Sequence, residues 1–399
     1  MIKIEKIIPG GQALGTHEDG RKIFFWNALP DEIVDNYTIT KKKSHYYEAI
    51  AEKILNPSKY RTAPKDTCYL STSPWQIISY DYELQLKQEL VVELFREHNI
   101  NIESPQISTD NHDYFYRNKM EYSLYWDKEK EQILPAFHAR NSHRKIPITS
   151  SSIERPEIFQ SALEIIDSLN HRKEPAYKYQ SLLLRCNQSG EVSGGLYENH
   201  KPHPTFPNLT DVIIDRTYSY SPNGFFQINL PVYEKALIDI KSHIVTDEVL
   251  DLYSGVGTIG LSAANNKQLT LVECDKYAYN EMLKNITTNK PSVTMGDKTS
   301  QYQFDNITAI LDKSENVINH IHPNQTVILD PPRSGCDVRL INKLNEVIPQ
   351  TIIYLSCNPA TQARDVKLLL NHYQIDMVKA YNFFPRTPHI ENLVILHKS

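Results

Sequence analysis

The spacing of hydrophobic and polar residues divides the chain into three segments. In residues 1–60, short stretches of alternating polar and apolar residues at 3–8, 22–26 and 33–40 are separated by turns such as Pro9-Gly10-Gly11. Short strands broken by glycine and proline are typical of a small β-barrel. In residues 226–399, continuously apolar stretches alternate with helical ones, which predicts a largely parallel sheet with helices on both faces.

The segment between them, residues 61–225, is predicted to be a linker helix followed by a middle α+β domain. Over Tyr80–Glu97 apolar residues recur at helical spacing among charged ones, as in an amphipathic helix. Strand-like alternation follows at 120–126 and 181–186, with one helical stretch at 156–169.

Seven candidate strands fill the C-terminal segment. They cover residues 249–253, 269–273, 292–295, 326–329, 351–356, 375–382 and 392–397. This order predicts an α/β fold with a Rossmann-like, seven-stranded sheet. Ligands of such sheets bind outside the carboxyl ends of the strands, so side chains at those ends are the first candidates for function.

Composition narrows the class of protein. With 40% hydrophobic and 23% charged residues, and no stretch near the roughly 18 apolar residues that a membrane helix needs, we expect no membrane association. The N-terminus has no apolar core of the kind that a secretory signal carries, so we expect a cytoplasmic protein. The five cysteines are scattered and form no Cys-x-x-Cys pair, which argues against a disulfide framework and against a metal site.

The charge balance alone does not indicate a nucleic-acid partner. The net charge is −5 and the pI is near 6.3, whereas a nucleic-acid-binding domain is often strongly basic. Basic clusters do occur, at residues 41–43, 117–119 and 140–145, and the chain has 24 tyrosines that can stack on bases. For any single cluster, a solvated surface is an equally good explanation.

A glycine-containing loop follows the first strand of the sheet. Gly255 and Gly257 permit a tight turn and close approach of a ligand to a helix N-terminus, without the Gly-Lys-Ser/Thr ending of a phosphate-binding P-loop. Glu273 ends the second strand, where a carboxylate can bind the ribose hydroxyls of a nucleoside. Asp297 follows the third candidate strand and is placed to meet an adenine. Alternatively, the glycines serve only helix–strand packing.

Three further side chains belong to the same predicted edge. Asp330 begins Asp-Pro-Pro-Arg-Ser-Gly after the fourth strand, although an aspartate there can simply cap a turn. Cys357 ends the fifth strand, where a thiol can meet a ligand, although an average cysteine is a buried apolar residue. Glu391 precedes the last strand, although a glutamate in a loop is usually exposed. Cys336 lies close enough to Asp330 to require a control variant.

These motifs together resemble one family, the RNA uracil-5-methyltransferases, over nearly the whole chain. The matching blocks, in the family's order, are Gly224-Phe225-Phe226-Gln227-Ile228-Asn229, Asp251 to Gly260, Asp330 to Gly335, Ser356 to Thr361 with Arg364-Asp365, and His389-Ile390-Glu391. The opening residues 4–15 resemble the OB-like, RNA-binding TRAM barrel of the ribosomal RNA enzymes. The resemblance implies that the barrel and the middle domain bind RNA and that residues 226–399 are catalytic.

The resemblance also implies a mechanism and a set of site residues. Cys357 is the expected nucleophile, which adds to carbon 6 of a uridine, and Glu391 is the expected base, which removes the proton from carbon 5. Asp330 and Gln227 are expected to contact the substrate. The S-adenosylmethionine positions fall on Gln227, Tyr253, Gly255, Gly257, Thr258, Glu273, Asp297 and Asp330. The target base must leave its stack to reach such a site.

The sequence departs from the family in one respect. Many ribosomal RNA members carry a four-cysteine iron–sulfur cluster between the barrel and the catalytic region, but the corresponding stretch here, residues 66–80, offers only Cys68, and residues 148–152 contain no cysteine. Four thiolates cannot be gathered, so we expect no cluster. The expected partner is RNA, with ribosomal RNA favoured over transfer RNA, and we expect a monomer.

Two alternatives remain open. A methyltransferase of the same sheet that acts on an exocyclic amine can use an Asp-Pro-Pro motif without a nucleophilic thiol. A non-catalytic RNA-binding factor can keep the pocket as a relic, although the joint presence of Cys357 and Glu391 argues against it.

Overall fold

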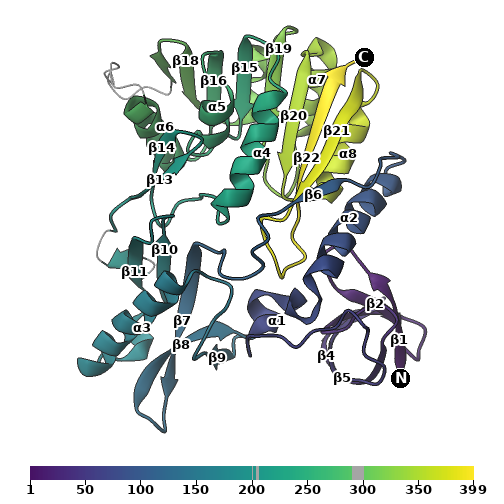
Figure 1. The fold of residues 1–399 in the computed structure, drawn as a ribbon, viewed down its shortest axis with the longest axis vertical. Coiled ribbons are helices and arrows are strands. Elements are labelled where there is room, and N and C mark those ends of the chain that lie inside the picture. The colour runs from purple at the N-terminus through teal and green to yellow at the C-terminus, as the bar shows by residue number, and fades with distance from the viewer. Residues whose placement is uncertain (200, 204–205, 290–300) are drawn as a thin grey trace.

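A computed structural model describes residues 1–199, 201–203, 206–289 and 301–399 of the chain (Figure 1). The N-terminal strands close into the predicted barrel, with the order β1-β2-β3-β5-β4. The alternation of the strands turns Ile4, Phe25 and Ala49 into its interior, where each is fully buried. The strands are β1 (Ile2–Ile7), β2 (Ala13–Thr16), β3 (Lys22–Trp26), β4 (Ile33–Lys42) and β5 (Tyr46–Ile54).

A helical segment joins the barrel to the rest of the molecule. It consists of α1 (Tyr69–Thr72), the 3-10 turn η1 (Pro74–Ile77) and the predicted helix α2 (Tyr80–Glu97). Helix α2 packs against α8 of the large sheet, and its buried apolar residues belong to one hydrophobic core with those of the barrel and one face of that sheet. The helix therefore packs as part of the large-sheet unit rather than as a free linker.

The middle domain is an antiparallel sheet with one helix packed on it. Within the described residues its order is β12-β11-β10-β7-β8-β9, and α3 packs on β8 and β10. The elements are β7 (Lys119–Asp127), β8 (Gln132–His138), β9 (Lys145–Pro147), α3 (Pro156–His171), the 3-10 turn η2 (Ala176–Lys178), β10 (Ser181–Cys186), β11 (Val192–Glu198) and β12 (Lys201–His203). A separate hairpin, β13 (Leu209–Ile213) and β14 (Arg216–Tyr220), packs against α6 of the catalytic domain.

The large sheet has the order β17-β18-β16-β15-β19-β20-β22-β21-β6 among the described residues. Strands β18, β16, β15, β19 and β20 are parallel neighbours, and β22 pairs antiparallel with β20. The strands are β6 (Gln106–Ser108), β15 (Glu248–Leu252), β16 (Gln268–Glu273), β17 (Gln301–Phe304), β18 (Ile307–Leu311), β19 (Gln325–Leu329), β20 (Thr351–Ser356), β21 (Tyr373–Tyr381) and β22 (Glu391–Lys398).

Helices cover both faces of this sheet (Figure 1). They are α4 (Leu230–Ser242), α5 (Thr258–Ala263), α6 (Lys276–Asn289), α7 (Val338–Val347) and α8 (Pro359–Leu369), with the 3-10 turns η3 (Ser314–Asn316) and η4 (Ile318–His320). The doubly wound α/β fold is thus confirmed. None of the helices in the described part of the chain is long and apolar enough to cross a membrane.

The structure changes two details of the predicted sheet. The short edge strand β6, from residues 106–108, pairs with β21 and adds a strand that local sequence did not indicate. The predicted strand 292–295 lies outside the described residues, and the strand that pairs with β16 is β18. The position after the third parallel strand therefore belongs to Asp312.

Candidate active site

The predicted side chains gather where the parallel strands end. Because β15, β16, β19 and β20 run in the same direction and in register, the residues that follow them meet at one edge. Tyr253, Asp330 and Cys357 are the first residues after their strands, and Glu273 is the last residue of β16. Asp297 lies outside the described residues.

The glycine loop bends next to Glu273. Gly255 has a φ of +58°, and a side chain added to it would meet open space, so its backbone is free to approach a ligand. Its N–H donates to Glu273 Oε2 over 2.8 Å. Gly257, with a φ of +86°, differs, because an added Cβ would lie only 3.0 Å from Leu261 Cδ1. Gly257 thus also allows close packing of the start of α5 against Leu261 and against Met282 of α6.

Two other loop residues have polar neighbours. Tyr253 has a φ of +65°, and a hydrogen bond joins its phenol to Ser314, in the turn after β18. Thr258 is the first residue of α5 and is 95% buried. A hydrogen bond links its side chain to Tyr233 of α4, which lies close enough to Asp330 for that carboxylate to raise the pKa of its phenol.

Asp312 is the acidic residue that sequence reasoning missed. It directly follows β18, its side chain is exposed, and its N–H donates to the carbonyl of Glu273 over 3.1 Å. The apolar stretch Ile307–Leu311 carries the signal for this strand, but the stretch at 292–295 also fits a third strand and points to Asp297 instead. Asp312 is therefore bonded through its backbone to Glu273, whose own carboxylate contacts the glycine loop.

Cys357 lies among charged groups. Burial raises the pKa of its thiol to about 11, and the nearby carboxylates of Glu391 and Asp330 act in the same direction. Arg333 opposes them with its positive charge and a hydrogen bond to the thiol. The side chain is partly exposed at the strand end. The thiol is thus protonated at neutral pH and lies next to a cation that favours the thiolate.

The two carboxyl groups beside Cys357 are also perturbed. Burial raises the pKa of Asp330 to about 7. Glu391 is only 4% exposed, and burial, reinforced by the charge of Asp330, raises the pKa of its carboxyl well above the usual range. Carboxyl groups with such raised pKa values suit proton transfer near neutral pH, and they cluster at active sites.

Packing fixes the two turns that carry these groups against each other. Asn358 Nδ2 donates to the carbonyl of Arg333 over 2.8 Å, so the turn after β20 is tied to the turn after β19. Gly335 has a φ of +81°, and an added Cβ would lie 2.5 Å from a guanidinium nitrogen of Arg364. The distance between Cys357 and the Asp330 turn is therefore set by the fold.

Gln227 lies in a loop that the middle domain holds. Asn118 Nδ2 donates to the Gln227 carbonyl over 3.1 Å, and Arg185 donates to the Phe226 carbonyl over 2.7 Å. Lys119 donates to the carbonyl of Gly224 over 3.2 Å. The loop leads directly into α4, which carries Tyr233 next to Asp330.

Comparison with known proteins finds one family whose model matches this edge. A family model described as tRNA (Uracil-5-)-methyltransferase matches residues 211–399, the part that contains the sheet and this edge. Residues 211–399 thus resemble the RNA uracil-5-methyltransferases, as the motifs predicted. Proteins of Lactobacillus johnsonii and Prochlorococcus marinus, each named an uncharacterized RNA methyltransferase, are 29% and 28% identical over 97% and 89% of this chain, and 96% of each relative is covered.

A solved structure agrees with the fold along the full length. The tRNA (uracil-54, C5)-methyltransferase of Pyrococcus abyssi, in complex with S-adenosyl-L-homocysteine, matches with a TM-score of 0.75 and 23% identity over 99% of this chain and 100% of its own. This likeness shows the fold, and the expected enzyme class, an S-adenosylmethionine-dependent RNA (uracil-5-)-methyltransferase, agrees with the family model over residues 211–399 and with the relatives named RNA methyltransferases. The open space above Gly255 and the carboxylate of Glu273 fit that co-substrate.

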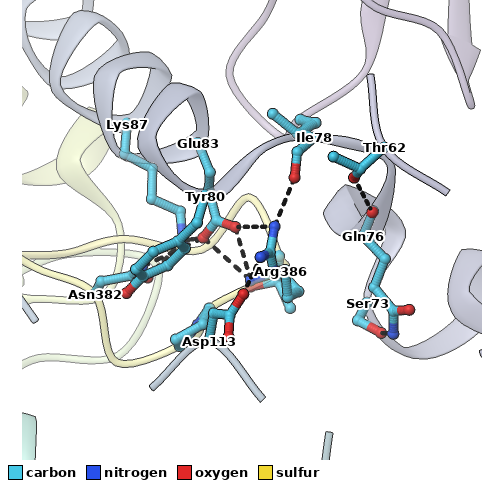
Figure 2. Close-up of polar contacts among 12 residues, drawn as sticks. Thr62, Ser73, Gln76, Ile78, Tyr80, Glu83, Lys87, Asp113, Asn382 and Arg386 are labelled. Carbon is cyan, nitrogen blue, oxygen red and sulfur yellow. Dashed lines mark hydrogen bonds and ion pairs between the residues drawn. The ribbon is translucent and has the colours of Figure 1, made fainter. Parts of the chain in front are cut away.

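The region expected to lack an iron–sulfur cluster contains a hydrogen-bonded polar cluster. Gln76 Nε2 donates to Asp66 Oδ2 over 2.6 Å and to Ser73 Oγ over 2.7 Å, and Ser152 Oγ donates to Asp66 Oδ2 over 2.7 Å (Figure 2 shows Gln76 and Ser73). Cys68 is buried nearby. Over the described ranges, no group of three or more His, Cys, Asp or Glu side chains is arranged to hold a metal ion.

Proposed function

We propose that this enzyme methylates carbon 5 of a uridine in RNA through a covalent adduct with Cys357, and that Glu391 is the base that resolves the adduct. The observation that carries the proposal is the neighbourhood of Cys357, where Glu391, Asp330 and Arg333 all act on the thiol. A nucleophile, a base and a cation at one strand end are the groups that this reaction needs. An enzyme that methylates an exocyclic amine needs no such thiol.

The chemistry balances with these groups. The partly exposed Cys357 thiol releases its proton to solvent. The thiolate forms a bond to carbon 6 of uracil, and the π electrons of the C5–C6 bond move onto the ring as an enolate. Carbon 5 then takes the methyl group, and the electron pair of the broken sulfur–carbon bond stays on the sulfur of the co-substrate. Glu391 removes the proton from carbon 5, and that electron pair restores the C5–C6 double bond and expels the thiolate.

Other residues bind and orient in this proposal. Arg333 stabilises the thiolate, because its hydrogen bond and charge favour the ionised form. Asp330, whose pKa is about 7, can donate or accept a hydrogen bond at the uracil edge. Gln227 completes the substrate contacts from its loop.

The co-substrate is proposed to lie along the glycine loop. S-adenosylmethionine supplies an electrophilic methyl group on a sulfonium. Glu273 would bind the ribose hydroxyls, with Tyr253, Gly255 and Thr258 lining the loop. Asp312, which follows β18, takes the adenine position that the sequence had suggested for Asp297.

Ribosomal RNA is the proposed substrate, because the N-terminal sequence resembles the TRAM barrel of ribosomal RNA enzymes. Transfer RNA is a second candidate, because the Pyrococcus abyssi enzyme, named for tRNA uracil 54, matches the whole chain. We further propose that the protein is a cytoplasmic monomer whose barrel and middle domain contact the RNA.

Nucleoside mass spectrometry tests the substrate. RNA from cells with and without the gene is separated into ribosomal and transfer fractions, and 5-methyluridine is mapped in each. Loss of 5-methyluridine at a ribosomal position supports the proposal, and loss in transfer RNA alone replaces it with the second candidate. No change in either fraction would leave the proposed reaction without a product.

A second experiment tests the mechanism. Glu391→Gln retains the nucleophile but removes the base, so a protein–RNA adduct that survives denaturing gels should accumulate. If the variant forms no adduct and keeps full activity, Glu391 is not the base.

A further inference from the structure

The turn that leads to Glu391 is held from outside its own domain. Residues 382–390 connect β21 to β22, and Glu391 is the first residue of β22. In Figure 1 this yellow connection extends from the sheet toward the barrel and the middle domain. A nine-residue connection between two strands has many conformations, so the position of Glu391 depends on what fixes the turn.

A buried ion pair on α2 provides the first contacts. Lys87 is fully buried, and its ammonium donates to Glu83 Oε1 over 2.9 Å, to Asn382 Oδ1 over 2.6 Å and to the Phe384 carbonyl over 3.1 Å. Two of these three acceptors belong to the turn. An ammonium has three N–H donors, so each of them has a partner. Figure 2 shows Lys87 and Glu83 reaching from the helix to Asn382.

Three further backbone groups of the turn, on Pro385 and Arg386, are hydrogen-bonded. The N–H of Arg386 donates to both oxygens of Glu83, over 3.1 and 3.0 Å. The carbonyl of Pro385 accepts from the Tyr116 hydroxyl over 3.0 Å, and that of Arg386 accepts from the N–H of Trp75 over 3.0 Å. All three partners precede the middle sheet in the chain, and the nearest of them in sequence, Tyr116, lies 269 residues away.

Arg386 locks the same turn with its side chain. Its φ of +62° lies in the left-handed region that non-glycine residues avoid, so surrounding contacts must hold it there. Its guanidinium donates to the Ile78 carbonyl over 2.6 Å and is ion-paired with Asp113 (Figure 2). On the other side, an added Cβ on Gly11 of the barrel would lie 2.2 Å from Pro388 Cβ, so the turn also packs against the barrel.

We infer that Glu83, Lys87, Tyr116 and Arg386 are positioning residues for Glu391, which hold the turn so that its carboxylate reaches the proton on carbon 5. This inference rests on the proposed function. A purely structural ion pair could have been replaced by apolar side chains, and burying a lysine and a glutamate is costly. Here the buried charges of Glu83 and Lys87 form hydrogen bonds with backbone groups of one turn. A positioning role requires such contacts.

The inference predicts which step slows. Cys357 follows β20 and is fixed by the turn with Asn358, so addition to carbon 6 and methyl transfer should be nearly unaffected when the network is weakened. Proton removal by a displaced Glu391 should slow about tenfold or more, since a positioned base contributes about two orders of magnitude or more. The methylated adduct should therefore accumulate.

The experiment uses the full chain, total RNA from cells that lack the gene, and S-adenosylmethionine with a tritiated methyl group. Protein-bound label that survives denaturation is measured beside the label released into RNA, for Lys87→Met and Tyr116→Phe. The second variant removes one hydroxyl and no charge, so it tests the idea even if Lys87→Met folds poorly. Both should raise the bound-to-released ratio at least severalfold over wild type.

Two further variants, a control and a reference, are measured in the same assay. Lys379→Met is the matched control, because Lys379 lies in β21, outside the turn of residues 382–390, and pairs with Asp239 of α4 over 2.6 Å. Glu391→Gln is the reference for blocked proton removal. If Glu391→Gln accumulates adduct and the two network variants behave like Lys379→Met, the positioning role is wrong and the mechanism stands. If Glu391→Gln itself gives no adduct, the proposed function fails first.

Discussion

The register of two strands places Cys357 opposite Glu391, because Ser356 of β20 pairs with Asn392 of β22 in an antiparallel ladder. The residue after Ser356 and the residue before Asn392 occupy the next position of that ladder, where side chains point to the same face. The influence of Glu391 on the pKa of the Cys357 thiol agrees with this placement. A shift of one residue in the register would turn the two side chains to different faces.

Replacing the nucleophile should abolish methyl transfer without unfolding the site. We expect Cys357→Ala to lower the rate of methyl transfer to RNA by about three orders of magnitude or more, because no other group can form the adduct. Binding of S-adenosylhomocysteine, measured by calorimetry, should be unchanged. Cys336→Ala is the control, since Cys336 is 92% buried next to Asp365 and should be dispensable for chemistry. Equal activity loss in both variants would point to folding instead.

The negative charge of Asp330 should affect the pKa of the Cys357 thiol even when no substrate is bound. At pH 9 the Asp330 carboxyl, with a pKa of about 7, is ionised, and the Cys357 thiol, with a pKa of about 11, is mostly protonated. Asp330→Asn removes a negative charge that disfavours the thiolate, so the thiol pKa should fall and alkylation by iodoacetamide should accelerate severalfold, given that one pKa unit is about tenfold in thiolate.

Peptide mass spectrometry measures that alkylation at Cys357 alone. The background should carry Cys274→Ser, because Cys274 is exposed and would also react. A rate that stays the same or decreases in Asp330→Asn would mean that the carboxylate does not act on the thiol.

The sequence predicted the strand ends that carry Asp330 and Cys357 better than it predicted the outer strands of the sheet. Strands β19 and β20 are buried at every residue, so their apolar stretches were recognisable and located Asp330 and Cys357 at the strand ends. The pairing of β6 with β21, by contrast, joins segments about 270 residues apart, and no local pattern encodes such a contact. Two apolar stretches, 292–295 and 307–311, competed for the third parallel strand, and of these the second is the one that pairs with β16 in the described residues.

Buried charges were the least predictable part of the molecule. Glu83 and Lys87 lie four residues apart on an amphipathic helix, where charged residues are normally exposed. Both are fully buried because the turn before Glu391 supplies partners for them, and those partners lie 295 or more residues further along the chain. Arg185, 1% exposed, is a similar case, since its partners are backbone carbonyls of the Gln227 loop.

Two carboxylates should contribute to co-substrate binding. We expect Glu273→Gln and Asp312→Asn each to weaken the binding of S-adenosylhomocysteine about tenfold, the value for losing one charged hydrogen bond. Isothermal calorimetry at constant pH measures the dissociation constants. Asp305→Asn is a matched control, because Asp305 is an exposed aspartate at the opposite end of β18. Weakening by Glu273→Gln alone would return the adenine position to Asp297.

Asp251 should make the enzyme less stable as the pH rises. Burial raises the pKa of its carboxyl from 3.8 to about 8 in the folded chain. The folded state therefore holds a proton that the unfolded state releases. The resulting stabilisation is complete below about pH 4, declines through the window between the two pKa values, and is absent above about pH 8.

Asp251→Asn should flatten this part of the pH profile. The amide oxygen can still accept the N–H of Gly260, which donates to Asp251 over 2.9 Å, so the fold should be retained. Relative to wild type, the urea midpoint of the variant should increase steadily from pH 5 to pH 8 and then level off. Asp247→Asn, at a side chain that is 99% exposed, is the control. Parallel profiles for wild type and Asp251→Asn would contradict the assigned shift.

The enzyme should be active without iron. Cys68 is 99% buried, and burial followed by the charge of Asp66 raises the pKa of its thiol to about 12, so it is neither a thiolate nor accessible at neutral pH. We expect protein purified without oxygen to lack stoichiometric iron and visible charge-transfer absorption. Cys68→Ser should keep wild-type methyl transfer. Iron at one cluster per chain that disappears in Cys68→Ser would show that a cluster does form.

Gln76→Ala, in contrast, should lower the melting temperature by several degrees, because it leaves the buried Asp66 carboxylate short of a hydrogen bond.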